Sequence, residues 1–307
     1  MHTRIFAKRL PRSVIFAVLA GCCLLLTASA LSADEDQAWL SWNTPADKSL
    51  CPDEPTFAWV EHEHGEECIR YYPGEDIRNT PVVIAQFYGD RDKVMRQPVD
   101  QIRNNTRQSQ EGYAARQTGR AGVPVVVVAR PGTYGSSGDH GQRRQPGEYY
   151  SLDTALDLIK ERYGIQRFVL TGHSGGATAA AALLTLGRTD VRCAVISSGA
   201  FDLLNRAEML RDAKGRRSRP GLDTTGLPEP YDPLDHIQEI AHDPERVVII
   251  LGNPDDTVTP FPLQLAFANA LEDAGHRVQV HIHPAKEPSF HNLLGNVAIE
   301  TAGGCAR

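Results

Sequence analysis

A short glycine-rich motif around one serine is the part of the sequence best suited to chemistry. The residues Gly172-His173-Ser174-Gly175-Gly176 follow an apolar run that ends near Thr171, and they precede an alanine-rich stretch. G-x-S-x-G between a strand and a helix forms a turn so sharp that larger side chains two positions before and after the serine would collide with backbone. The motif therefore predicts that Ser174 is an exposed nucleophile at the carboxyl end of a strand.

Two other kinds of turn could contain these glycines. A phosphate-binding loop of the G-x-x-x-x-G-K-[ST] type is excluded because its lysine is missing. An ordinary strand-to-helix turn, with Ser174 capping the helix, is the remaining alternative. The strand before the motif and the helix after it favour the nucleophile. The same geometry directs the Gly175 N–H toward a developing oxyanion.

Two pairs of histidines could ligate a metal. His62 and His64 belong to an acidic turn, while His281 and His283 alternate along a predicted strand. Zinc sites use three or four protein ligands, and no third ligand can be assigned to the turn. Exposed turn and strand positions explain both pairs, so we expect no metal and no cofactor. His173, beside the nucleophile, is expected to line the pocket.

The elements that position Ser174 alternate between strands and helices. Segments 56–60 and 68–72 predict an antiparallel hairpin. Nearly unbroken apolar runs predict strands covered on both faces, at 81–87, 123–129, 167–171, 191–197, 247–251 and 278–282. Helical patterns lie at 94–108, 152–163, 176–186, 263–274 and 290–301. This alternation predicts an α/β domain with a mostly parallel sheet.

From about Asp76 onward the sequence resembles the α/β-hydrolase superfamily. The resemblance covers about three quarters of the chain. It is carried by the G-x-S-x-G motif and by a loop after the preceding strand, Arg130-Pro131-Gly132-Thr133-Tyr134-Gly135-Ser136-Ser137-Gly138. It implies the α/β-hydrolase fold, with a mostly parallel central sheet, helices on both faces and a short lid insertion. It also implies a triad in the order nucleophile, acid, histidine.

In this order the chain offers Ser174, then Asp255 or Asp256, then His291. We expect Asp255 to be the acid. In the family pattern the acid follows a glycine by three residues and precedes an anchoring apolar residue by three, as Asp255 does between Gly252 and Val258. Asp256 is interpreted as a turn residue that hydrogen-bonds local backbone.

The resemblance also implies an oxyanion hole and a reaction. The expected donors are the Gly175 N–H and a second group from the loop Tyr88-Gly89-Asp90, either the Tyr88 hydroxyl or a backbone N–H of Tyr88 or Gly89. His291 would take the Ser174 proton, and an acyl-enzyme would form. The predicted substrate is a small-molecule ester or acyl compound. An exopeptidase, an acyltransferase or a non-catalytic binding protein on the same fold are the alternatives.

The N-terminus has the composition of an export signal. Basic residues precede an apolar run over 14–26, and the small residues Ala28, Ser29 and Ala30 follow. The run is shorter than a membrane span, so we expect cleavage after Ala30 and a periplasmic or secreted protein without a stable span. A lipoprotein anchored at Cys22 is the alternative. In an oxidising compartment the remaining cysteines predict disulfides Cys51–Cys68 and Cys193–Cys305, with buried free thiols as the other possibility.

The charge of the chain bears on its partners. With a formal net charge of -6, the chain lacks the excess of positive charge that is typical of nucleic-acid-binding proteins, so we expect no nucleic-acid partner. We expect three segments: a signal peptide at 1–30, an N-terminal extension with the hairpin at 31–75, and the catalytic domain at 76–307. A lid is expected at about 204–245. Its basic run from Arg211 to Arg219 is interpreted as a solvated surface turn, with binding of an anionic substrate as the alternative. The oligomeric state is not predicted.

Overall fold

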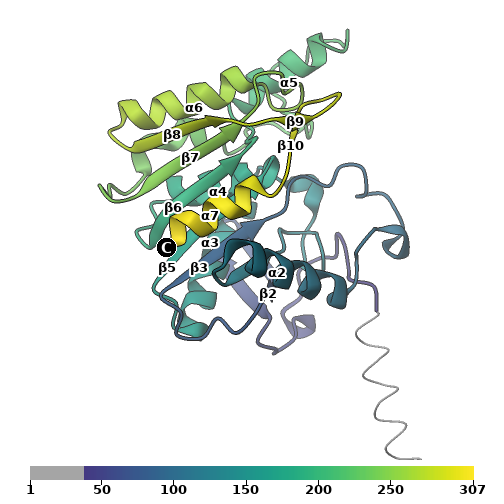
Figure 1. The fold of residues 1–307 in the computed structure, drawn as a ribbon. Helices are drawn as coiled ribbons and strands as arrows, with labels where there is room; N and C mark the ends of the chain where they lie inside the picture. The colour runs from purple at the N-terminus through teal and green to yellow at the C-terminus, as the bar shows by residue number, and fades with distance from the viewer. Residues whose placement is uncertain (1–37) are drawn as a thin grey trace, which may run out of the picture.

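One sheet of eight strands organises residues 38–307, the part of the chain that the computed structural model describes (Figure 1). The strand order is β1-β2-β4-β3-β5-β6-β7-β8. β1 and β2 form an antiparallel hairpin, β2 pairs antiparallel with β4, and the remaining pairs are parallel. The predicted hairpin and the mostly parallel sheet are therefore confirmed. The predicted signal peptide and Cys22 lie outside the described residues.

The strands coincide closely with the apolar runs of the sequence. Their bounds are β1 Phe57–His62, β2 Gly65–Pro73, β3 Val82–Phe87, β4 Val125–Val128, β5 Arg167–His173, β6 Val191–Ser197, β7 Val247–Gly252 and β8 Arg277–Ile282. β4 consists of four fully buried valines, because β-branched side chains pack well in a strand covered on both faces. β8 differs from the prediction: it forms an edge of the sheet and is largely exposed.

Helices cover both faces of the sheet (Figure 1). α2 and α7 pack on one face, while α3, α4 and α6 pack on the other. Their bounds are α2 Arg107–Ala121, α3 Pro146–Tyr163, α4 Gly175–Thr185, α6 Phe261–Asp273 and α7 Val297–Ala306; α5, Leu203–Asp212, lies beyond the end of the sheet. All of α4 is buried. Its small side chains let the helix lie close to the sheet directly behind Ser174.

Short elements complete the described chain. The 3-10 helices are Lys48–Leu50, Val99–Gln101, His140–Gln142 and Pro233–Glu239. A two-stranded ribbon joins β9, Ala285–Lys286, to β10, Asn292–Leu293. No helix among residues 38–307 is both long enough and apolar enough to cross a bilayer.

Two predicted helices are wrong in position. The segment 94–108 forms turns and a 3-10 helix, because Pro98 lacks the N–H that a helix interior needs and Asn104 has a φ of 60°. The helix begins only at Arg107, where the Thr106 side chain accepts the Ser109 N–H. The predicted helix at 290–301 starts instead at Val297, after β10 and a glycine with positive φ.

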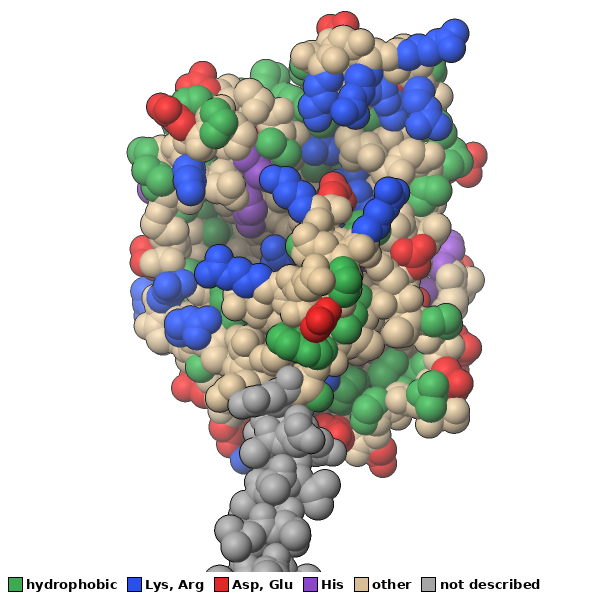
Figure 2. All heavy atoms as spheres, turned by 90° about the vertical axis from the view of Figure 1, so that its right-hand side faces the viewer, with side chains coloured by type: hydrophobic (Ala, Val, Ile, Leu, Met, Phe, Trp, Pro, Cys, Tyr) green, Lys and Arg blue, Asp and Glu red, His purple; other side chains and the backbone are tan. Residues whose placement is uncertain are grey.

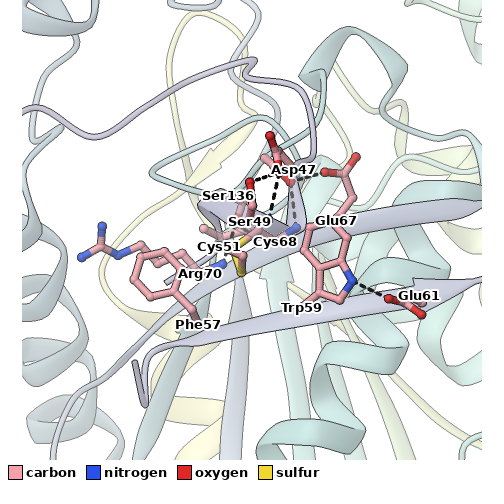
Figure 3. Close-up of a disulfide and its surroundings, with 12 residues drawn as sticks. Asp47, Ser49, Cys51, Phe57, Trp59, Glu61, Glu67, Cys68, Arg70 and Ser136 are labelled. Carbon is pink, nitrogen blue, oxygen red and sulfur yellow. Dashed lines mark hydrogen bonds between the residues drawn. A yellow bond between two sulfur atoms is a disulfide. The ribbon is translucent and has the colours of Figure 1, made fainter. Parts of the chain in front are cut away.

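Two disulfides join different elements of the fold. Cys51–Cys68 ties the N-terminal segment to β2, beside Trp59, whose indole N–H donates to Glu61 at 2.7 Å (Figure 3). Cys193–Cys305 ties β6 to α7. Both pairings agree with the prediction. The second cross-link closes the much longer loop and holds the C-terminal helix on the sheet.

Candidate active site

Ser174 lies at the turn between β5 and α4 with a strained backbone. Its φ of 56° and ψ of -126° are unusual for a residue with a side chain, and such strain costs of the order of 1–3 kcal/mol. The Ser174 N–H donates to the Ser197 carbonyl at 2.9 Å, which holds the turn against β6. A Cβ on Gly172 would lie 2.3 Å from Gly176, and one on Gly176 would lie 2.3 Å from the Phe87 carbonyl oxygen. The expected need for both glycines is thus confirmed.

His291 lies between β9 and β10, directly before the first residue of β10, and is buried. Its Nδ1 lies 2.9 Å from Oδ2 of Asp256, whose side chain has no solvent exposure. Thr259 Oγ1 donates to the same carboxylate oxygen at 2.8 Å. Burial alone would raise the pKa of Asp256, but the hydrogen bond and charge of His291, together with hydrogen bonds from Thr259, lower this pKa below its usual value. Asp256 is therefore a carboxylate that orients the imidazole.

The prediction that Asp255 is the acidic partner of His291 is wrong. Asp255 is exposed, and its N–H donates to Oδ1 of Asn253 at 2.9 Å. This side-chain-mediated turn leaves Asp255 at the outer corner and brings Asp256 back beneath the end of β7. The N–H of Val258, the residue chosen as the anchor of the loop, donates to Oδ1 of Asp256 at 2.8 Å. The loop is built around Asp256.

Two cavities share Ser174 and His291. The larger, of about 860 Å³, extends under α5 and the segment after it. The other, of about 510 Å³, is lined by aromatic side chains that include Tyr88, Tyr113 and Tyr134. A nucleophile and a buried histidine on the wall of both cavities could act on a bond whose two halves occupy the two spaces.

The expected oxyanion donors lie next to the serine, with one difference. A Cβ on Gly89 would come within 3.3 Å of the Ser174 Cβ, so the backbone of the β3 loop passes beside the nucleophile. The Tyr88 hydroxyl donates to Gln110 at 2.7 Å, on α2. Its proton is therefore engaged away from Ser174, which favours the backbone alternative for the second donor. Gly175 opens α4, where the N–H groups of the first turn have no partner within the helix.

A buried ion cluster supports the oxyanion side of the site. Asp90 lies so close to Gly175 that a Cβ there would meet its Oδ1 at 1.9 Å. Asp90 pairs with Arg130 at 2.9 Å and also with Arg144, and Arg130 pairs with Glu148 at 2.6 Å. Burial would raise the pKa of Asp90, but the neighbouring guanidiniums hold it well below its usual range. The cluster locks the β3 loop against the first turn of α4.

His173 packs against the candidate base. The ring centroids of His173 and His291 are 4.6 Å apart, and His173 lines the smaller cavity, as expected. Burial, with the nearby His291, lowers the pKa of His173 to about 4. His173 is therefore neutral at physiological pH and adds no charge beside His291.

The sequence did not lead us to expect four of the residues at this site: Asp90, Arg130, Asp256 and Arg206. The sequence does contain a signal for Asp90 and Arg130. Each follows a buried strand of the parallel sheet, and ligand sites commonly form at the carboxyl ends of such strands. For Asp256, the family spacing favours the neighbouring Asp255 instead. Arg206 belongs to a helix that was not predicted. Of the expected site residues, the structure brings Ser174, His291, Gly175 and Gly89 together, and it leaves Asp255 outside.

Residues 38–307 contain no group of three or more His, Cys, Asp and Glu side chains arranged to hold a metal. At least one histidine of each pair discussed above contacts a protein group. His62 Nε2 lies 2.8 Å from Ser151 Oγ, and His283 Nε2 lies 3.1 Å from the Leu294 carbonyl oxygen.

Comparison with known proteins places this geometry in context. Residues 121–291, more than half of the chain, match the prolyl oligopeptidase family. No curated protein sequence matches the chain.

Solved structures share the fold at low sequence identity. Est1E from Butyrivibrio proteoclasticus, in a structure with ferulic acid bound, is 13% identical with a TM-score of 0.54 over 80% of this chain and 96% of that one. An arylesterase is 15% identical with a TM-score of 0.53, over 86% of this chain and 88% of the arylesterase. Pyrococcus horikoshii acylaminoacyl peptidase is 13% identical with a TM-score of 0.48 over 82% of this chain, which spans 40% of that peptidase. The α/β-hydrolase fold expected from the sequence is confirmed.

Proposed function

We propose, on the premise that this chain belongs to the prolyl oligopeptidase family of α/β-hydrolases, that it hydrolyses carboxylic esters through an acyl-enzyme on Ser174. Membership of the family makes the chain a serine hydrolase. The class of bond and the roles of individual residues are the proposal. The observation that carries them is the buried hydrogen bond from His291 to Asp256, on the wall of the cavity that also contains Ser174.

The proposed reaction uses the imidazole twice. His291 accepts the Ser174 proton as the oxygen attacks the ester carbonyl, and Asp256 stabilises the imidazolium that forms. The N–H groups of Gly175 and of the Tyr88-Gly89 backbone would stabilise the oxyanion. His291 then gives the proton to the departing alcohol. Water, activated by the same histidine, hydrolyses the acyl-enzyme and releases the acid.

Several observations support an ester as the substrate. Of the three structures above, the two with the higher TM-scores are Est1E with ferulic acid bound and an arylesterase, and this chain covers 96% and 88% of their lengths. Ser174 lines two cavities, which could take the acyl and alcohol halves of an ester. The family match favours a second candidate, an exopeptidase, with the same triad. An acyltransferase would use the triad too, with another acceptor in place of water.

We further propose that the protein acts outside the cytoplasm and carries a lid. Two disulfides are typical of an oxidising compartment and support export. α5 and the segment after it line the larger cavity and form the proposed lid at about 204–245. The remaining boundaries, a signal peptide at 1–30, an extension at 31–75 and a catalytic domain from 76, belong to the same proposal.

A fluorophosphonate probe tests the nucleophile directly. We expect the probe to label the protein, and Ser174→Ala to abolish both labelling and p-nitrophenyl butyrate hydrolysis, with a loss of about a millionfold in kcat. Ser49→Ala, an exposed serine on the N-terminal segment, is the matched control and should behave like the wild type. Labelling that survives in Ser174→Ala would refute the assignment. Aminoacyl p-nitroanilides, assayed beside the esters, separate the esterase from the exopeptidase.

A further inference from the structure

The larger cavity beside Ser174 is unusually rich in cations. Although the whole chain has a formal net charge of -6, nine of its Lys and Arg side chains line this one space. They come from the segment after β3, from the loop before α3, from α5 and from the chain that follows α5: Arg91, Lys93, Arg144, Arg206, Arg211, Lys214, Arg216, Arg217 and Arg219.

The charges of this cavity are not balanced. Its three acidic residues are all ion-paired: Asp90 with Arg130 and Arg144, Asp92 with Arg143 at 2.5 Å, and Asp223 with Arg144 at 3.1 Å. Among the described residues, only two of the nine cations, Arg144 and Arg211, pair with a carboxylate. The charge that remains without a partner is therefore entirely positive.

Arg206 is the innermost of these unpaired cations. It lies on α5, and only 6% of its surface is exposed. Its Nε donates to the Val258 carbonyl at 3.0 Å and its Nη1 to Thr224 Oγ1 at 3.3 Å, while no carboxylate of residues 38–307 pairs with it. A guanidinium has five N–H donors, so several remain for a ligand. Burial and the nearby Arg144 lower the pKa of Arg206 to about 10, and it stays charged at neutral pH.

The outer cations form a rim. Lys214, Arg216, Arg217 and Arg219 are exposed, and they follow one another on the segment after α5. Figure 2 shows Lys and Arg side chains gathered over a hollow in this face, with histidine visible inside it. A solvated surface turn would explain the rim by itself. It does not explain a buried, unpaired arginine on the wall of the same cavity, because an unpaired buried charge is costly.

We propose that this cavity binds an anionic group of the substrate, so that the ester cleaved at Ser174 carries a carboxylate or a similar anion on one of its two halves. The inference rests on the proposed function. Arg206 holds the anion near the reacting bond, since its planar fork fits a carboxylate oxygen pair. The rim raises the local concentration of anionic substrate, an effect that salt screens.

Matched ester pairs test the preference. In the first pair, p-nitrophenyl hydrogen glutarate carries a carboxylate on the acyl half, and methyl p-nitrophenyl glutarate is its neutral counterpart. In the second pair, 3-carboxyphenyl butyrate carries the carboxylate on the alcohol half, and its methyl ester at that carboxyl group is the neutral counterpart. We expect kcat/KM to favour the anionic member of at least one pair by about tenfold to 100-fold. Equal kcat/KM values within both pairs would overturn the inference while the proposed function stands.

Two variants identify the groups responsible. Arg206→Met should remove most of the preference, and Arg206→Lys should restore part of it. The triple variant Lys214→Gln/Arg216→Gln/Arg217→Gln alters only exposed side chains and should lower the salt dependence of kcat/KM for the anionic ester. Arg116→Met removes an exposed charge from α2, away from the cavity, and is the charge-matched control. A preference retained in full by both Arg206→Met and the triple variant would also overturn the inference.

Binding separates this inference from the proposed function. Calorimetry on Ser174→Ala measures affinity for each ester without turnover, and we expect tighter binding of the anionic member of the preferred pair. Absence of that difference contradicts the inference even in an active enzyme. Failure of the wild type to be labelled by fluorophosphonate contradicts the proposed function instead, whatever the binding result.

Discussion

Neutralising Asp256 should disable the enzyme without unfolding it. The carboxylate accepts hydrogen bonds from His291 through Oδ2 and from the N–H groups of Val258 and Thr259 through Oδ1, at 2.8 to 2.9 Å. In Asp256→Asn the remaining carbonyl oxygen can keep both backbone bonds, which leaves the amide NH₂ facing His291. The imidazole Nδ1 must then accept, so its proton moves to Nε2, the atom that should receive the Ser174 proton.

A wrong tautomer in a serine triad costs about 10,000-fold in kcat, or about 5 kcal/mol of transition-state stabilisation. The assay is p-nitrophenyl butyrate hydrolysis at pH 7.5, with urea unfolding as a check that the variant is folded. Asp255→Asn is the control: Asp255 is exposed, and within residues 38–307 its hydrogen bond to Asn253 runs through its backbone N–H, so kcat should stay within about twofold of the wild type. A larger loss in Asp255→Asn than in Asp256→Asn would refute the reasoning.

Two further predictions concern groups whose surroundings are unusual. Tyr88→Phe should keep kcat within a few-fold of the wild type, because its hydroxyl is bonded to Gln110; a loss of 100-fold or more on the same ester would return the hydroxyl to the oxyanion hole. Asp232 is buried and accepts the Leu203 N–H at 2.5 Å, and burial raises its pKa from 3.8 to about 6. The folded protein therefore holds this proton more tightly than the unfolded chain, and stability is lost as pH rises toward and through 6. Between pH 4.5 and 7.5 the free energy of unfolding should fall by about 2 kcal/mol more in the wild type than in Asp232→Asn, and parallel urea curves for the two would contradict this.

Local rules in the sequence were enough for the sharp turn at Ser174 and for the framework of strands. The need for Gly172 and Gly176 follows from the sharpness of one turn, a property of a few adjacent residues. The strands follow from apolar runs, which are buried in β3 to β7, while β8 forms from such a run at an exposed edge. The two disulfides also agree with the expectation that Cys51 pairs with Cys68, its neighbour in the sequence, and that the remaining two cysteines pair with each other.

Helix positions were predicted less well, for a physical reason. The pattern over 94–108 has the spacing of a helix, but Pro98 and the cap at Thr106 act through individual backbone hydrogen bonds that a spacing pattern does not register. α5 was not predicted, because its burial depends on packing beyond the end of the sheet.

The choice between Asp255 and Asp256 required the tertiary structure. Both neighbours have the same chemistry, and only the turn made by the Asn253 side chain decides which one faces His291, which lies 35 positions beyond Asp256 in the sequence. The unbalanced charge beside Ser174 is a second case. Read along the chain, the basic run after α5 is an ordinary surface segment. Folding brings it, together with Arg206, over the cavity of the nucleophile, because the packing of α5 beyond the sheet, and not sequence proximity, determines which charges share a space.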